Sequence, residues 1–193
     1  MIVGLTGGLA CGKSFVASAL RNMGAYVVEA DDLGRAVIAP GGEAVDAVLR
    51  EFGTTDRQRL ATRVFTDPEA LVRLNAIIHP AVRARALREF ASIHARDPHA
   101  IIIYVAAILF ESGANRETSK VITVNCTPAQ QVERALERQG ATLKDVEARI
   151  AGQMPVEQKA ALADFIIDAS GAKDETLRQT KIVFEELKKL ASL

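Results

Sequence analysis

The sequence contains little cysteine, no excess charge of either sign and no long apolar run. Cys11 and Cys126 are too few for a disulfide framework, which is typical of a protein from a reducing compartment. Lys plus Arg and Asp plus Glu number 24 each, so no overall field argues for a nucleic-acid or membrane partner. The longest apolar run, residues 100–110, is too short to cross a bilayer. The first predicted strand begins at Met1-Ile2 and leaves no room for a signal peptide, so we expect a cytoplasmic protein.

The remaining composition is that of an ordinary globular protein. The chain has 193 residues, of which 49% are hydrophobic and 25% charged, enough for one packed domain but short for two. It has no internal repeat and no low-complexity segment. We expect a monomer or a weak homo-oligomer.

Apolar runs alternate with helical patterns along the chain. Continuous apolar runs predict buried strands at 2–6, 25–30, 101–105, 121–124 and 165–167. Apolar residues at helical spacing predict helices at 13–23 and 173–190, and an almost wholly helical stretch at 33–96, broken at 41–42 and 53–55 and restarted near Pro68. This alternation predicts an α/β fold, a parallel sheet flanked by helices, with residues 38–96 as a helical insertion after the second strand.

A phosphate-loop motif lies between the first predicted strand and the first predicted helix. Gly7-x-x-x-x-Gly12-Lys13-Ser14 supplies backbone N–H groups and a helix N-terminus for phosphate, and its lysine can reach the β- and γ-phosphates. A chance glycine-rich turn is the alternative, and the strand and helix on either side argue against it. The Ser14 hydroxyl is a candidate ligand for Mg²⁺. We expect ATP to contact Gly8, Ala10, Cys11, Gly12, Lys13, Ser14 and Phe15, with Cys11 and Phe15 contributing mainly backbone N–H groups and Cys11 otherwise a passive loop residue.

The surrounding residues favour a kinase among the classes that use such a loop. The guanine-reading Asn-Lys-x-Asp of a regulatory GTPase is absent, and Asp31-Asp32-Leu33-Gly34 follows Lys13 too closely to leave a switch loop. The run 101–105 does not end in the aspartate usual in motor ATPases. Asp31 instead ends the second predicted strand, where ligands gather in parallel sheets and a carboxylate can accept a proton from a hydroxyl. We expect Asp32 to cap a helix that begins at Leu33.

Two arginines and a polar segment extend this interpretation. Arg134 and Arg138 lie four residues apart on one predicted helix, so that both guanidinium groups can face a phosphoryl group. Pairing of the two arginines with Glu133 and Glu137 on a solvated face is an equally open alternative. The polar segment 140–155, bounded by Gly and Pro, is typical of a mobile cover that keeps water from the reaction.

Motifs along nearly the whole chain resemble those of the dephospho-coenzyme A kinase family. They are Gly4-Leu5-Thr6-Gly7-Gly8 with Gly12-Lys13-Ser14, Ala30-Asp31 with Arg35, Arg63-Val64-Phe65, Leu74-Asn75-Ala76-Ile77-Ile78-His79-Pro80, Leu109-Phe110-Glu111, Cys126-Thr127-Pro128, Gln131 with Arg134 and Arg138, Arg149-Ile150 with Gln153-Met154-Pro155, and Ala163-Asp164 with Ile167-Asp168 and Ser170-Gly171.

The resemblance implies a P-loop kinase that transfers the γ-phosphoryl group of ATP to the 3′-hydroxyl of the ribose of dephospho-coenzyme A. It implies a nucleotide-binding core (1–37, 97–137 and 158–193), an acceptor domain (38–96) and a lid (138–157). It further implies catalytic roles for Asp31, Lys13 and Arg138, ATP contacts for Arg134, and acceptor contacts for Thr6, Asp31, Arg35 and His79. The His79-Pro80 pair could otherwise cap a helix.

The chain departs from the family pattern at a few positions. Glu29 and Ala169 stand where the family often has Asp and Asn, Ala107 stands where Pro or an acidic residue is common, and the link 52–60 is shorter than usual. None of these removes the loop, Lys13 or Asp31. A kinase for another small nucleoside-like acceptor and a non-catalytic nucleotide-binding regulator remain the alternatives.

Overall fold

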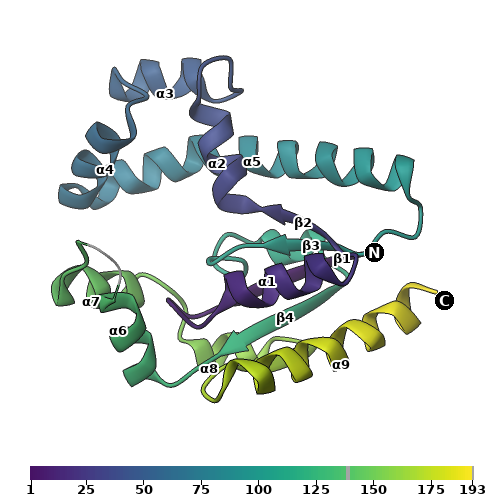
Figure 1. Cartoon of the computed structure of the whole chain (residues 1–193). Coiled ribbons are helices and arrows are strands. Elements are labelled where there is room, and N and C mark those ends of the chain that lie inside the picture. The colour runs from purple at the N-terminus through teal and green to yellow at the C-terminus, as the bar shows by residue number, and fades with distance from the viewer. Residues whose placement is uncertain (138–139, 193) are drawn as a thin grey trace. The chain divides into compact units, whose positions relative to one another are not determined.

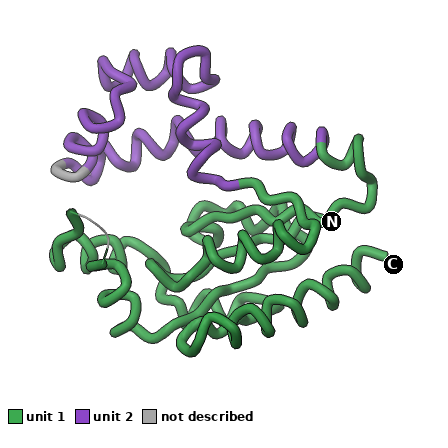
Figure 2. The backbone as a smooth tube through the Cα atoms, viewed as in Figure 1, with its two compact units in different colours: residues 1–28, 93–193 green, residues 29–92 purple. Residues whose placement is uncertain are grey.

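The computed structural model describes residues 1–137 and 140–192 (Figure 1). The chain forms two compact units (Figure 2). Unit 1 comprises Met1–Val28 and Ile93–Leu193, and unit 2 comprises Glu29–Ser92. The helical segment expected between the second and third strands, 38–96, overlaps most of unit 2, which begins earlier at Glu29 and includes α2 (Ala30–Ile38). Its role as an acceptor domain, and that of 138–157 as a lid, stay predictions.

A five-stranded sheet carries the core of the fold. Its strands are β1 (Ile2–Gly7), β2 (Tyr26–Glu29), β3 (Ile102–Val105), β4 (Lys120–Asn125) and β5 (Phe165–Asp168), in the order β2-β3-β1-β4-β5. β1 pairs in parallel with β3 and β4, and β4 pairs in parallel with β5. The side chains of the central strands are buried because helices cover them, which explains their continuous apolar sequence. The predicted parallel α/β sheet is confirmed.

The helices of unit 1 pack around this sheet. They are α1 (Lys13–Asn22), α6 (Pro128–Leu136), α7 (Leu143–Ala151), α8 (Val156–Ala161) and α9 (Lys173–Ala191), with a short 3₁₀ helix at Ala114–Glu117. α1 and α9 contact each other, and α8 contacts β4 and β1. Leu20 of α1, Ile122 of β4 and Leu187 of α9 are fully buried in the shared apolar core. The phosphate loop follows β1, the central strand of the sheet.

Unit 2 consists of helices with a core of their own. The helices are α2 (Ala30–Ile38), α3 (Val45–Phe52), α4 (Arg57–Thr66) and α5 (Pro68–Arg96), the last of which ends in unit 1. Val37, Val48, Phe52 and Leu74 pack together inside it. The breaks fall at the predicted glycines because Gly53 adopts the left-handed conformation that ends α3, at a φ of 69°.

The second strand ends earlier than its sequence suggests. β2 stops at Glu29 and α2 begins at Ala30, so Asp31 and Asp32 both lie in the first turn of the helix. The expectation that Asp32 caps a helix beginning at Leu33 is wrong. Carboxylates in a first turn are stabilised by the helix dipole, and Asp32 also pairs with Arg35 three residues on. These effects favour starting the helix before the two aspartates.

Within residues 1–137 and 140–192, no helix is both long enough and apolar enough to cross a lipid bilayer.

Candidate active site

The segment between β1 and α1 forms the phosphate loop. Gly12 is the N-cap of α1 at a φ of 90°, and its carbonyl accepts from the backbone N–H groups of Phe15 and Val16 at 3.0 and 3.1 Å. Ala10 also has a positive φ, 56°, which is costly for a residue with a Cβ and is typical of a functional loop. At Gly7, a Cβ would collide with the carbonyl oxygen of Val124 on β4. Glycine is therefore required where the loop leaves the sheet.

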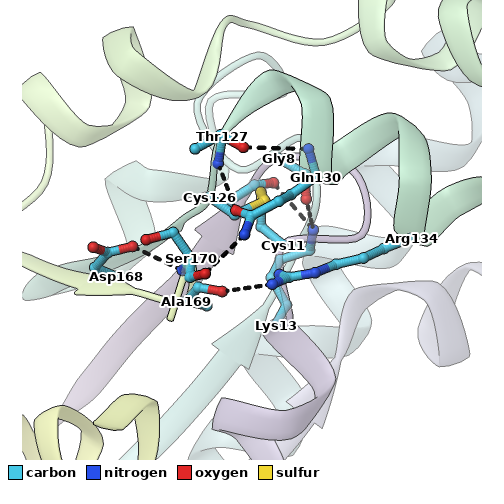
Figure 3. Close-up of a disulfide and its surroundings, with 11 residues drawn as sticks. Gly8, Cys11, Lys13, Cys126, Thr127, Gln130, Arg134, Asp168, Ala169 and Ser170 are labelled. Atoms are coloured by element: carbon cyan, nitrogen blue, oxygen red, sulfur yellow. Dashed lines mark hydrogen bonds between the residues drawn. A yellow bond between two sulfur atoms is a disulfide. The ribbon is translucent and has the colours of Figure 1, made fainter. Parts of the chain in front are cut away.

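Lys13 lies over the inside of this loop. Its Nζ donates hydrogen bonds to the carbonyl oxygens of Gly7 and Gly8, at 3.0 and 2.8 Å (Figure 3). Ser14 follows in the first turn of α1 with its side chain exposed. The loop thus combines an ammonium group with the positive end of a helix, which is the arrangement that binds phosphate.

A disulfide holds the loop to the neighbouring strand. Cys11 pairs with Cys126, which directly follows β4, and their Cα atoms lie 5.3 Å apart (Figure 3). Both residues are buried. The expectation that Cys11 is a passive loop residue is therefore wrong. β1 and β4 are parallel neighbours, so residues just beyond their carboxyl ends meet although 115 positions separate the two cysteines.

α6 holds the loop that follows β5. Arg134 donates from Nη2 to the carbonyl oxygen of Ala169 at 3.0 Å, and Gln130 donates from Nε2 to that of Ser170 at 2.7 Å (Figure 3). A Cβ at Gly12 would lie 3.7 Å from that of Ala169, in ordinary contact. Arg134 is thereby fixed beside the phosphate loop by a main-chain contact. The ATP contact expected of it stays a prediction.

Two glutamines of α6 were missed as site-building residues. Gln131 is buried, and a Cβ on Gly8 would lie 2.5 Å from its Oε1, so the glycine lets α6 approach the loop. Gln130 forms a capping box with Thr127, in which each side chain accepts from the other's backbone N–H. The Thr-x-x-Gln spacing is a visible signal of that cap, whereas the second contact of Gln130, to Ser170, joins elements distant in sequence.

The residues expected to contact the acceptor belong to different units of the chain. Asp31 and Arg35 belong to α2 in unit 2 and have exposed side chains, and Arg35 pairs with Asp32. Thr6 belongs to β1 in unit 1, where it is fully buried and donates from Oγ1 to the carbonyl oxygen of Ala107 at 3.3 Å. Their contacts with a substrate stay predictions. Arg138, the expected lid arginine, lies outside the described residues.

His79 lies in the middle of a helix. It is half-buried on α5, and Pro80 follows inside the same helix, so the alternative of a helix-capping pair is wrong. Pro80 removes one backbone hydrogen bond of the helix and can leave a carbonyl unpaired. Burial lowers the pKa of His79 below its ordinary value, which favours the neutral imidazole. A neutral ring can both donate and accept a hydrogen bond.

The protein donors for a metal ion are few. Among the described residues no group of three or more His, Cys, Asp or Glu side chains could hold one. The exposed Ser14 hydroxyl at the start of α1 suits a cation that takes one protein oxygen and completes its shell with phosphate oxygens and water. Mg²⁺ in phosphoryl-transfer sites has this preference.

A phosphate loop on the central strand of a parallel sheet, beside an arginine-bearing helix, defines a P-loop protein of the kinase type. The fold agrees with this class, since a shikimate kinase structure from Acinetobacter baumannii superimposes with a TM-score of 0.55 at 15% identity, over 97% of this chain and 93% of that one. A dephospho-CoA kinase structure from Campylobacter jejuni has the same fold, with a TM-score of 0.72 at 24% identity over 97% of both chains.

The chain belongs to the dephospho-CoA kinase family, whose model matches residues 1–175. A curated dephospho-CoA kinase from Anaeromyxobacter dehalogenans is 41% identical over 90% of this chain and 85% of its own. The one from Syntrophotalea carbinolica is 35% identical over 97% and 92%. A crystal structure from Thermus thermophilus superimposes with a TM-score of 0.81 at 32% identity, covering 97% of both chains. The resemblance drawn from the sequence motifs is confirmed.

Proposed function

We propose that this chain transfers the γ-phosphoryl group of ATP to the 3′-hydroxyl of the ribose of dephospho-coenzyme A, giving coenzyme A and ADP. The observation that carries the proposal is the phosphate loop with Lys13 inside it, in a chain whose motifs match this family over residues 1–175. A kinase for another nucleoside-like acceptor and a non-catalytic regulator would carry the same loop, so the acceptor must be tested directly.

The phosphate loop binds the triphosphate in this proposal. Its backbone N–H groups and the N-terminus of α1 hold the β-phosphate, and Lys13 exchanges its carbonyl partners for the β- and γ-phosphate oxygens. Arg134 and Arg138 neutralise charge that spreads over the phosphoryl oxygens during transfer. These residues act by position and charge, since phosphoryl transfer requires little covalent chemistry from the protein.

Asp31 is the general base for the hydroxyl group of the acceptor in this proposal. Its carboxylate orients the ribose 3′-hydroxyl and accepts the proton as the hydroxyl oxygen bonds to the γ-phosphorus. The bond between that phosphorus and the β,γ-bridging oxygen breaks, and the electron pair leaves with ADP. Arg35 and His79 of unit 2, and Thr6 beside the loop, bind the acceptor in this scheme.

Ser14 would hold Mg²⁺ together with oxygens of the bound nucleotide. The ion supplies charge neutralisation at the β- and γ-phosphates. We place the protein in the cytoplasm, although a disulfide such as Cys11–Cys126 is uncommon there, and expect a monomer or weak homo-oligomer. The balanced charge is in keeping with a protein that has no nucleic-acid or membrane partner.

A coupled assay of ADP release over a panel of acceptors tests the function. We expect ADP and coenzyme A in equal amounts with dephospho-coenzyme A, and little inorganic phosphate. A better rate with another nucleoside-like acceptor would favour that second kinase, and ATP binding without product would favour the regulator.

A further inference from the structure

The largest fully buried side chain in the part of the chain that the structure describes belongs to a lysine. Lys159 in α8 has no exposed surface, and a buried ammonium is unfavourable unless it is paired. Its Nζ donates to the carbonyl oxygen of Ala107 at 2.5 Å and lies 2.9 Å from Oε1 of Glu111. Neither residue was assigned a role from the sequence, although Glu111 lies in one of the family-like motifs.

Hydrogen bonds connect α8 to β1, which precedes the phosphate loop, and to β4, which precedes Cys126. The carbonyl oxygen of Ala107 also accepts from Oγ1 of Thr6, the residue before the loop motif. The carbonyl oxygen of Lys159 accepts from Oγ1 of Thr123 at 3.1 Å. Thr6 and Thr123 are partners in the register of β1 and β4, and both are fully buried. The lysine is thus connected to the base of the loop at both strands.

Glu111 connects the same lysine to the segment predicted to be the lid. Its Oε1 accepts from the backbone N–H of Met154 at 2.8 Å, in the turn after α7. Burial alone would raise the pKa of Glu111, but hydrogen bonds from Lys159 and from backbone N–H groups outweigh it, and the pKa lies below its usual value. The carboxylate is therefore ionised at neutral pH and holds this turn by charge-assisted hydrogen bonds.

Gln153, the residue before Met154, has a buried side-chain oxygen, Oε1, without a hydrogen-bond partner among the described residues. Buried acceptors are nearly always paired with a protein group or with water, so the described residues alone do not complete the hydrogen bonding of this turn. Glu111 therefore holds the turn at Met154, one residue after a side chain that lacks a partner among the described residues.

We propose that Lys159, acting through Glu111, is a positioning residue that fixes the base of the lid to the strands carrying the phosphate loop. The proposal rests on the proposed function. A buried ion pair is weak evidence for a stabilising role, because apolar side chains of similar volume often stabilise a core as well or better. The position of the lid relative to the bound phosphates is what the pair secures.

Lys159→Met, Glu111→Gln and the double variant separate positioning from stability. Lys159→Met alone leaves an uncompensated carboxylate, so we expect a lower melting temperature. The double variant removes both charges at nearly constant volume and should recover most of that loss. Its turnover of dephospho-coenzyme A should still fall by ~10–10²-fold, the size of a misplaced catalytic geometry, with a smaller change in the KM for ATP. A double variant with both wild-type stability and wild-type turnover would overturn the proposal.

A matched control and a second readout complete the experiment. Lys189→Met removes an exposed lysine of α9 that pairs with Glu186, and it should leave turnover unchanged. Hydrogen exchange with and without ATP reports on the lid independently of product. We expect ATP to slow exchange at 143–155 in the wild type, and the double variant to lose this effect while keeping protection at 7–14.

If ATP slows hydrogen exchange at 143–155 equally in the wild type and the double variant, or not at all in the wild type, the positioning role of Lys159 is contradicted. If the wild type binds ATP but makes no coenzyme A, the proposed function fails, and the exchange comparison still decides whether Lys159 positions the lid.

Discussion

Cys11 in the phosphate loop and Cys126 after β4 form a disulfide that joins two segments 115 residues apart in sequence. The bond lies in the core beneath the loop, since the two residues are 0% and 3% exposed. It restricts how far the loop can open, and it makes the loop's covalent state dependent on the redox conditions around the protein.

Reduction of this disulfide should destabilise the protein. A bond that closes a loop of this length restricts the unfolded chain, and such bonds stabilise by about 2–4 kcal/mol. We expect the free energy of unfolding in denaturant to fall by that amount when a reductant is present. Cys126→Ala provides the control, because its stability should not respond to reductant. A wild-type protein that is equally indifferent to reductant would contradict the prediction.

Lys13→Ala should abolish most of the turnover. Removal of one preorganised charge at the transferring phosphoryl group typically costs at least ~10²-fold. Lys173→Ala is a matched control, since Lys173 is the exposed first residue of α9 as Lys13 is the first of α1. Steady-state turnover and circular dichroism of both variants decide the outcome. A folded Lys13→Ala protein with an unchanged rate would remove Lys13 from the mechanism.

Asp31→Asn and its neighbour Asp32→Asn should behave differently. Asp31→Asn keeps the shape and removes the base, so we expect normal folding and ATP binding with coenzyme A formation reduced by ~10²–10⁴-fold. Asp32 is exposed and pairs with Arg35, so Asp32→Asn should cost little activity. Turnover of both variants with dephospho-coenzyme A is the measurement. A dead Asp32→Asn protein would show that the base is misplaced by one residue.

His79 should make the protein less stable as the pH falls. Its pKa is lowered in the folded state by burial, so the unfolded chain binds more protons near and below the ordinary histidine pKa of about 6.5. The free energy of unfolding therefore rises with pH through this window and declines as pH falls from 7 toward 5.5. His79→Gln should flatten that part of the melting-temperature profile. His99→Gln, at an exposed loop position, should not.

The sequence was sufficient to predict the features that depend on local pattern. The apolar runs of β1, β3 and β4 identified a buried parallel sheet, because strands covered on both faces have no polar side to show. The Gly-Lys-Ser loop was recognised because its function requires fixed spacing between a strand and a helix. Gly53 and Pro68 marked helix ends through their own backbone preferences.

Tertiary structure decided what depends on contacts between distant segments. The pairing of Cys11 with Cys126 follows from the order of the strands, which neither cysteine reveals. The first turn of α2 formed around Asp31 and Asp32 although the strand pattern continued toward them. Lys159 is polar in sequence and would be assigned to the surface. Its burial is possible because Glu111 and the carbonyl oxygen of Ala107, from another part of the chain, both contact its ammonium group. Such contacts between distant segments cannot be predicted from the local sequence pattern.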